Sequence, residues 1–451
     1  MPYIPHTPED VARILGACKI STIEELLERV IPAELRAAGP LDLPGGLAEQ
    51  ELAGELSRLA SKNTPVDEYS SFLGAGAYNH YVPAVVDALA SRSEFSTAYT
   101  PYQPEVSQGT LQAVFEYQTL VCQLTGMDVS NSSLYDGASS VAEAVLMARR
   151  VTGRDRVVVS SALHPEYRQT LKTYLSGAGD HVSEIAFSPE TGRTPAAAAE
   201  EALGADPAAL VVQHPNFFGC LEDLEDLARA VHARKGLLVV VVTEPVSLGL
   251  LRPPGELGAD IAVGENQSFG AALNFGGPYL GFMATKDRFV RHMPGRLVGR
   301  TVDHDGKRAF CLTLATREQH IRRNKATSNI CSNQGLCALA AAIHLVSIGK
   351  AGLRKLALVN LSKAAYLSER LTSVAGVEAA FTGATFNEFT VRFPEAPEPV
   401  LGRLLEKGIV GGLALGGFYP GLTRHALVAA TEMNTREEIE EFAGALAGCL
   451  A

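Results

Sequence analysis

The sequence predicts an α/β fold with a mostly parallel sheet, because short apolar runs alternate with helical segments through its middle section. Residues 157–159, 209–212 and 237–242 are apolar at every position, which is typical of strands covered on both faces. Residues 221–234 carry apolar side chains at helical spacing between two of these runs. Such βαβ units bury a parallel sheet under helices on both sides. After Thr327 the pattern changes, which predicts a smaller α+β domain.

The first 65 residues are expected to form a helical arm. Thr7 and Pro8 supply an N-cap and a first-turn proline, and residues 21–24 (STIE) have the form of a capping box ahead of apolar positions. Residues 62–71 are polar and residues 72–79 are rich in glycine. The compact part of the chain is therefore expected to begin near residue 66.

We expect the large α/β domain to cover residues 66–330 and the C-terminal α+β domain to cover residues 331–451. Helical spacing of apolar residues, short apolar runs and a capping box at Thr435 and Glu438 locate the remaining elements. They are helices at 111–124, 139–150, 334–347 and after 435, and strands at 386–393 and 425–431.

Composition and charge exclude several functional classes. A chain of 451 residues with 46% hydrophobic and 20% charged residues can bury a large core. Its net charge of -11 argues against nucleic acid or an anionic membrane, which attract clustered Lys and Arg. The start lacks a basic region followed by an apolar stretch, and the most apolar run, residues 236–242, is far shorter than the roughly 20 residues that span a bilayer. We therefore expect a soluble cytoplasmic protein.

The cysteines argue against a metal site and against a disulfide framework. There are seven of them, an odd number, and no CxxC pair occurs. Free, mostly buried thiols are the expected state. No metal site is predicted.

The densest group of functional side chains lies in residues 97–109, TAYTPYQPEVSQG. Two tyrosines, two glutamines, two threonines and a serine occur within thirteen residues, with prolines at 101 and 104. Prolines keep the backbone irregular and stiff, so several hydrogen-bonding groups are held together, as in a recognition loop. The alternative is a capped turn ahead of the helix that begins at 111.

A second group, LYDGASSVAE, opens the helix expected at 139–150. Gly137, Ser139 and Ser140 could direct backbone N–H groups and hydroxyls towards an anion at the positive end of the helix. Small residues at this position more often cap a helix than bind phosphate. The two interpretations remain open on sequence grounds.

The section from VVVVTEP to ENQSFG resembles the part of a type I pyridoxal-phosphate enzyme that holds the cofactor. In such enzymes one strand ends in an aspartate for the pyridine nitrogen and the next ends in the Schiff-base lysine. Thr243 stands at the aspartate position, and Gln267 or Ser268 stands at the lysine position. No lysine occurs between Lys235 and Lys286. Because an aldimine needs an amine, this chain is expected to form none there.

A basic segment, TREQHIRRNKATSNIC, is unusual in so acidic a chain. Arg317, Arg322, Arg323 and Lys325 could bind a carboxylate, a phosphate or an acidic protein surface. A solvated helix face with pairs to Glu318 is the alternative.

Taken together, these blocks resemble the N-terminal half of glycine decarboxylase, the P-protein of the glycine cleavage system, and above all subunit 1 of its two-subunit bacterial form. The resemblance covers almost the whole chain. It rests on IPHTPED, TAYTPYQPEVSQG, NSSLYDGASSVAEA, ADIAVGENQSFGAALNFGGP, MPGRLVGRTVD, TREQHIRRNKATSNIC and EMNTREEIE, which occur in this order.

The resemblance implies a type I pyridoxal-phosphate fold and a role in glycine decarboxylation, with transfer of the aminomethyl group to the lipoyl-lysine of H-protein. It also implies that subunit 2 holds the pyridoxal phosphate covalently, that this chain alone is inactive, and that the assembly is an α2β2 heterotetramer with sites at subunit interfaces. No residue of this chain is then expected to be catalytic. The residues expected to line the glycine and cofactor pocket are Tyr99, Thr100, Tyr102, Gln103 and Gln108.

Two other functions are open at this point. One is a self-contained pyridoxal-phosphate transaminase or lyase that uses another lysine, such as Lys325. The other is a purely structural subunit that stabilises its partner without lining the site. An aldimine absorption band in the chain alone would favour the first, whereas the polar loop at 97–109 argues against the second.

Overall fold

The computed structural model describes residues 5–37, 39, 41–95, 99–177 and 182–450, and the chain divides into two compact units, Met1–Thr64 and Pro65–Ala451. The described part of the first unit is helical, and its α-helices contain no buried residue. They are α1 (Pro8–Ala17), α2 (Ile23–Val30) and α3 (Glu49–Ala60). The division of the second unit near residue 330 remains a prediction.

The cap of the first helix is confirmed and that of the second is corrected. Thr7 caps α1, with the Asp10 N–H donating to its hydroxyl at 3.2 Å. At α2 the cap is Thr22, one residue later than the STIE pattern predicts. Glu25 donates its N–H to Thr22 at 3.1 Å and accepts from the Ser21 N–H at 2.7 Å. In this register Glu25 also pairs with Arg29, which lies one helical turn further on.

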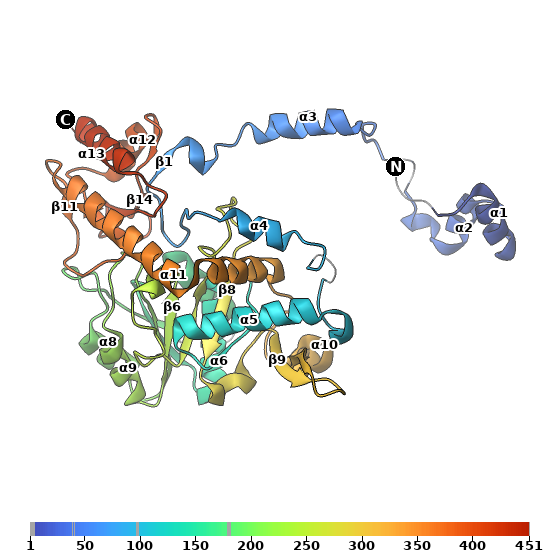
Figure 1. Cartoon of the computed structure of the whole chain (residues 1–451), viewed down its shortest axis with the longest axis horizontal. Helices are drawn as coiled ribbons and strands as arrows, with labels where there is room; N and C mark the ends of the chain where they lie inside the picture. The colour runs from blue at the N-terminus through green and yellow to red at the C-terminus, as the bar shows by residue number, and fades with distance from the viewer. Residues whose placement is uncertain (1–4, 38, 40, 96–98, 178–181, 451) are drawn as a thin grey trace. The chain divides into compact units, whose positions relative to one another are not determined.

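The second unit is built on a seven-stranded sheet with strand order β2-β8-β7-β6-β5-β3-β4 (Figure 1). The pairs from β4 through β3, β5 and β6 to β7 are parallel, and only β8 and β2 run antiparallel to their neighbours. The predicted mostly parallel sheet is thus confirmed. The strands are β2 (Val129–Ser130), β3 (Arg156–Ser160), β4 (Val182–Ile185), β5 (Pro207–Gln213), β6 (Leu237–Val242), β7 (Ile261–Glu265) and β8 (Gly281–Thr285).

Helices cover both faces of this sheet, as the uninterrupted apolar strands predict. Successive side chains of a strand point to opposite faces, so Val158 belongs to one core cluster while Val157 and Val159 belong to the other. The first cluster joins the sheet to α5 (Gln108–Thr125), α8 (Ala196–Leu203), α9 (Leu224–His232) and α11 (Gly335–Thr372), and the second joins it to α6 (Gly137–Thr152) and α7 (Pro165–Leu175).

A four-stranded antiparallel sheet forms a separate core near the C-terminus, as the end of the sequence predicts. The Thr435–Glu438 capping box is confirmed, because the Glu438 N–H donates to the Thr435 hydroxyl at 3.1 Å and Glu438 accepts in return at 2.6 Å. The elements are β11 (Glu378–Ala379), β12 (Glu388–Arg392), β14 (Leu413–Ala414), β15 (His425–Ala429), α12 (Pro397–Leu405) and α13 (Arg436–Leu450). A short parallel pair joins β1 (Ser70–Ser71) to β13 (Ile409–Val410).

The helix predicted at 334–347 forms the first part of α11. Gly349, at φ +60°, has a non-helical backbone and separates this part from a second helical part that ends at Thr372. Glycine adopts such a backbone conformation without strain. Among the described residues, α11 is also long and apolar enough to cross a bilayer. Its buried Ala338 and Ala341 instead belong to the core shared with α5 and the sheet.

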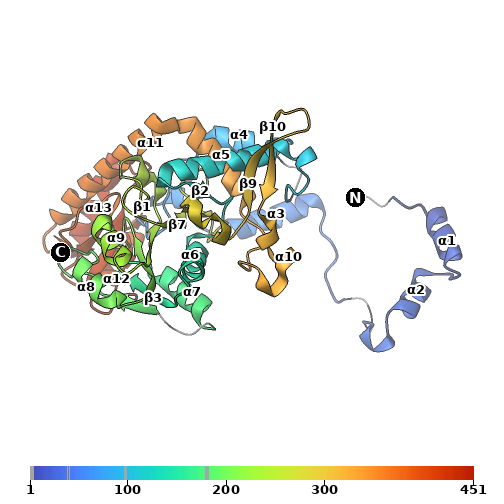
Figure 2. The same ribbon diagram turned by 90° about the horizontal axis from the view of Figure 1, so that it is seen from below.

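A β-hairpin and a group of short helices follow the large sheet. Strands β9 (Leu297–Val302) and β10 (Arg308–Thr313) pair antiparallel and lie beside α5 (Figure 2). The basic segment predicted from the sequence then folds into η6 (Ala315–Arg317), α10 (Gln319–Arg322) and η7 (Arg323–Lys325).

A buried charge network ties three distant segments of the second unit together. His80 lies between β1 and α4 (Ala84–Ala90), and its ring nitrogens lie 2.8 Å from Glu244 after β6 and 2.8 Å from Glu432 after β15. Burial opposes the charged form of His80, but the two carboxylates outweigh it and raise the pKa of His80 to about 10. The same contacts lower the pKa of Glu432 to about 2 against the opposing effect of burial.

Replacing His80→Gln should flatten the dependence of stability on pH. Below about pH 6.5 both the folded and the unfolded chain hold the His80 proton, and its stabilisation is fully present. Between pH 6.5 and 10 only the folded chain holds it, so the free energy of unfolding falls as pH rises, by at most about 1.4 kcal/mol per pH unit from this group. Urea unfolding across this range should show the loss in wild type and not in the variant.

The matched control is His304→Gln, because the His304 side chain is 90% exposed. That variant should keep the wild-type slope. An unchanged slope in His80→Gln would contradict the assignment.

Candidate functional site

Two positions at the carboxyl ends of neighbouring strands hold neutral, buried side chains. Thr243 follows β6 and accepts a hydrogen bond from the Gln213 amide at 3.1 Å. Gln267 follows β7, accepts from the Tyr78 N–H at 3.3 Å and donates to the Ala271 carbonyl at 2.6 Å. The chain's own polar groups therefore occupy both positions.

Ser268, the other position at which a lysine would stand, is buried as well. Lys235 precedes β6, and Lys286 follows the antiparallel β8, where its ammonium lies 3.5 Å from Asp260 just before β7. Both lysines thus lie at the amino ends of β6 and β7. Strands of five or six residues separate their two ends by roughly 15–20 Å. Neither amine reaches the carboxyl edge of the sheet.

The carboxylate of Glu265 fills the space between the end of β7 and the start of α6. It is 2% exposed and accepts from the backbone N–H groups of Gly137 at 3.0 Å, Leu280 at 2.6 Å and Gln267 at 3.2 Å. Gly137 is the first residue of α6, so the carboxylate lies at the positive end of that helix. Burial raises the pKa of Glu265 to about 7, although the backbone donors stabilise its charged form.

The ring of Tyr167 covers the same end of α6. A Cβ at Gly137 would lie 2.3 Å from the Tyr167 hydroxyl, so only glycine lets the ring approach this closely. The ring stacks on His164, with centroids 4.7 Å apart and planes at 28°. His164 accepts from the Glu166 N–H at Nδ1 and lies 2.8 Å from the Ala75 carbonyl at Nε2, which indicates the neutral Nε2–H tautomer. Burial lowers the pKa of His164 accordingly.

The turn before α6 makes the capping contacts that its small residues predict. The Ser139 N–H donates to the Asp136 carboxylate at 2.7 Å, and the Ser140 hydroxyl donates to the Asp136 carbonyl at 2.7 Å. A covalently held pyridoxal phosphate needs an amine and free donors for its phosphate. The residues at this edge supply no amine, and Glu265 and Asp136 take up the N–H groups of Gly137 and Ser139, so they do not fit a cofactor held covalently by this chain.

The polar loop ahead of α5 presents its tyrosines to the surface. Tyr99 is 89% and Tyr102 is 55% exposed, Gln103 is exposed, and Thr100 has a buried hydroxyl without a partner. Thr97 and the neighbouring alanine lie outside the described residues. The loop leads through η3 (Pro104–Val106) into α5.

Gln108 differs from the other residues predicted to line the pocket. Its amide donates to the carbonyls of Pro104 at 2.7 Å and Phe310 at 2.9 Å, and it accepts from the Phe310 N–H at 2.9 Å. This contact fastens the start of α5 to β10. A role in lining the pocket remains a prediction for Gln108.

A cavity of about 320 Å³ lies beside this loop. It is bounded by α5, the β9–β10 hairpin and the first residues of α11. The lining combines apolar side chains with a few polar groups, as ligand pockets do. The lining residues are Phe95, Tyr99, Pro101, Thr110, Ala113, Val114, Ser132, Arg296, Val298, Leu312, Asn333, Gln334, Gly335, Leu336 and Leu339.

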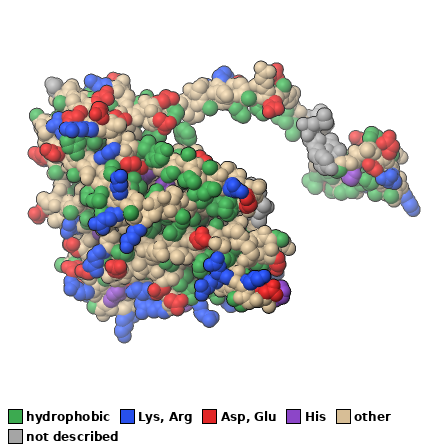
Figure 3. Space-filling view, in the orientation of Figure 1, with side chains coloured by type: hydrophobic (Ala, Val, Ile, Leu, Met, Phe, Trp, Pro, Cys, Tyr) green, Lys and Arg blue, Asp and Glu red, His purple; other side chains and the backbone are tan. Residues whose placement is uncertain are grey.

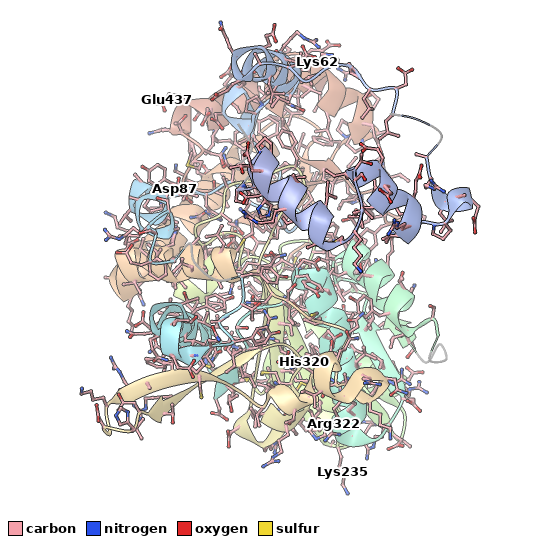
Figure 4. All side chains as sticks on the ribbon, turned by 90° about the vertical axis from the view of Figure 1, so that its right-hand side faces the viewer. Lys62, Asp87, Lys235, His320, Arg322 and Glu437 are labelled. Carbon is pink, nitrogen blue, oxygen red and sulfur yellow. The ribbon has the colours of Figure 1, made fainter. Side chains whose placement is uncertain are left out.

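The basic segment separates into one inward residue and three exposed ones. Arg317 is half-buried, and its guanidinium donates to the carbonyls of Leu314 at 3.0 Å and Gly295 at 3.1 Å. Arg322, Arg323 and Lys325 are exposed, and no ion pair to Glu318 joins any of the four in the described residues. Figure 4 shows His320 and Arg322 on α10. A partner or anion contact of this surface remains a prediction.

Comparison of the whole chain with known proteins shows which family it matches. Residues 1–446 match the family model of the glycine cleavage system P-protein. The chain is 52% identical over 446 residues to the probable glycine dehydrogenase (decarboxylating) subunit 1 of Desulforamulus reducens, covering 99% of each chain. It is 51% identical to the protein of the same name from Carboxydothermus hydrogenoformans, covering 99% of this chain and all of the relative.

Solved structures agree with the sequence relatives. A crystal structure of glycine decarboxylase (P-protein) in an inhibitor-bound form matches with a TM-score of 0.92 and 45% identity over the full length of both chains. A sphingosine-1-phosphate lyase from Burkholderia pseudomallei matches with a TM-score of 0.67 at 15% identity, covering 93% of this chain and 94% of its own. At that identity the likeness shows the fold alone. The type I pyridoxal-phosphate fold predicted from the sequence is confirmed.

Replacing Glu265→Ala should open the end of α6 and destabilise the chain. Three backbone N–H groups would lose their acceptor in a buried place, which should lower the free energy of unfolding by about 2–5 kcal/mol. Formate offers a carboxylate small enough for the vacated space and should restore part of the loss. Urea unfolding at pH 8 with and without formate measures both effects.

Glu200→Ala is the matched control, because Glu200 is exposed on α8. It should change stability by less than about 0.5 kcal/mol and show no response to formate. Wild-type stability in Glu265→Ala would show that the carboxylate does not hold the helix end.

Proposed function

The chain belongs to the glycine cleavage system P-protein family, and from that membership we propose that it acts as subunit 1 of a two-subunit glycine dehydrogenase (decarboxylating). The full-length match to relatives of that name, together with the full-length structural match, supports this function over a self-contained transaminase or lyase. The self-contained enzyme would use Lys325, which is exposed on η7 in the basic surface segment.

Subunit 2 holds the pyridoxal phosphate covalently in this proposal. The observation that carries this assignment is the carboxyl edge of the sheet, where Gln267 replaces an amine and Glu265 occupies the end of α6. When bound to subunit 2, the cofactor supplies the electron sink for loss of CO2 from glycine. The remaining aminomethyl group then passes to the lipoyl-lysine of H-protein. In this proposal the residues of this chain bind and orient the substrate, and they hold no cofactor.

An apolar surface supports assembly with subunit 2. Hydrophobic side chains gather over α4, α5 and α11 in the second unit (Figure 3). On α11, Leu336 and Val346 are 68% and 64% exposed. A second cavity, of about 640 Å³, lies between α5, α11 and η4 (Pro245–Gly249). Exposed apolar patches of this kind mark protein interfaces, and two αβ pairs joined by a two-fold axis give the proposed α2β2 heterotetramer.

The loop ahead of α5 completes the site of subunit 2 in this proposal. Tyr99, Tyr102 and Gln103 are exposed, and Thr100 adds a hydroxyl that lacks a partner. A purely structural subunit has no need for such polar groups. We also place the assembly in the cytoplasm, since the seven cysteines are free, as is usual in a reducing compartment.

The chain alone should show no glycine–bicarbonate exchange and no cofactor absorption band that borohydride traps. Adding subunit 2 with pyridoxal phosphate should produce both, with the trapped cofactor on subunit 2 alone. Exchange assays and mass spectrometry of the reduced complex measure this. Exchange activity or a trapped lysine in the chain alone would support the self-contained enzyme instead.

Replacing Tyr99→Phe or Tyr102→Phe should lower exchange activity of the complex by about 10- to 1000-fold, as expected for losing one positioned hydrogen bond near the reacting group. Each change removes only one hydroxyl from a side chain that is more than half exposed, so assembly with subunit 2 should be unchanged in size-exclusion chromatography. Tyr174→Phe, on α7 at the opposite face of the sheet from α5, should keep wild-type activity. Wild-type activity in both loop variants would reject the assignment.

A further inference from the structure

Arg296 is a buried guanidinium that this chain leaves partly without partners. It lies between η5 (Asp287–His292) and β9 and is 6% exposed. Its terminal nitrogens donate to the Asn333 amide oxygen at 3.1 Å and the Tyr102 hydroxyl at 3.4 Å. Its guanidinium carbon lies 5.5 Å from the centre of the Tyr102 ring, its Nε has no hydrogen-bond partner, and no Asp or Glu within the described ranges forms an ion pair with it.

Such an arrangement is unfavourable unless an anion completes it. Removing a charge from water costs several kcal/mol, and two neutral acceptors at these distances offset only part of that cost. Elsewhere in the described chain, buried charges such as His80 and Asp260 do have partners of opposite charge. The missing partner of Arg296 therefore points to a ligand from outside the chain.

A second buried group points to the same place. Ser132 is 2% exposed, its hydroxyl has no partner, and its backbone N–H donates to the Arg296 carbonyl at 2.9 Å. Both residues line the 320 Å³ cavity beside Tyr99. Gln334 and Gly335, at the start of α11, line it as well, and the positive end of a helix favours an anion.

We propose that Arg296, assisted by Ser132, binds the carboxylate of the glycine substrate held at the cofactor of subunit 2. This inference rests on the proposed function, and it names the part of the substrate that this chain would bind. The terminal nitrogens of Arg296 carry further N–H groups beside those bonded to Asn333 and Tyr102, and paired N–H groups of a guanidinium recognise a carboxylate. The mixed apolar lining suits a small monoanion better than a phosphate, which usually takes several backbone donors at once.

The charge of the carboxylate predicts which kinetic constant changes when the guanidinium of Arg296 is removed. The carboxylate leaves as neutral CO2, so Arg296 stabilises bound glycine at least as strongly as it stabilises the transition state. Removing the guanidinium should therefore act on KM and leave kcat largely unchanged. This split separates a substrate-binding arginine from one that merely supports the fold.

The test compares glycine with methylamine, which has the same amine and no carboxylate. In the complex with subunit 2 and pyridoxal phosphate, Arg296→Gln should raise KM for glycine about 10- to 100-fold and change kcat by less than about threefold. The glycine dissociation constant, from titration of the cofactor absorbance, should rise by a similar factor. The methylamine constant should stay within about threefold. Arg300→Gln, which removes an exposed arginine from β9, should change neither.

Ser132→Ala gives a second, milder variant, since its hydroxyl makes no hydrogen bond that folding requires. It should weaken glycine binding several-fold and spare methylamine. Equal weakening of both ligands, or none, would overturn the proposal. Loss of the cofactor from Arg296→Gln on dialysis, with equal effects on both ligands, would assign the anion to the cofactor phosphate and overturn it as well. A wild-type complex without exchange activity would instead refute the proposed function.

Discussion

The buried carboxylate of Glu265 is the constraint on which the functional character of this chain depends. It joins the end of β7 to the start of α6 and to Leu280 through three backbone N–H groups. In a parallel sheet covered by helices, this edge is where ligands usually bind. A side chain of the protein already occupies it, and no lysine stands at the end of β7. In the proposed function, this chain therefore contributes to the reaction through its surface.

Much of the fold could be predicted from the sequence because burial leaves a periodic signal. Strands covered on both faces are apolar at every position, and the alternation of Val157, Val158 and Val159 between two cores is the direct cause of that pattern. An error arises where local signals compete. Ser21 and Thr22 can both cap a helix, and the chain uses Thr22.

The site could be predicted only in part, since its decisive contacts join residues far apart in the sequence. The absence of a lysine near Gln267 is visible in the sequence, and so is the polar loop ahead of α5. The pairing of Glu265 with Gly137, 128 residues away, has no local signature beyond a carboxylate at the end of an apolar strand. Arg296 lies within a motif that supports the family resemblance, but its burial and its unpaired Nε appear only in three dimensions.

Glu265 and Arg296 differ in whether the chain itself supplies all their partners, and this difference separates a structural role from a functional one. Glu265 is a buried charge whose donors all come from its own chain, and such satisfied groups specify a fold. Arg296 is a buried charge whose partners are incomplete, and the proposed ligand supplies the missing one. One edge of the molecule is therefore closed by its own residues while the cavity beside the loop stays open to a ligand. In the proposed function, this cavity is where the chain acts on the substrate held by subunit 2.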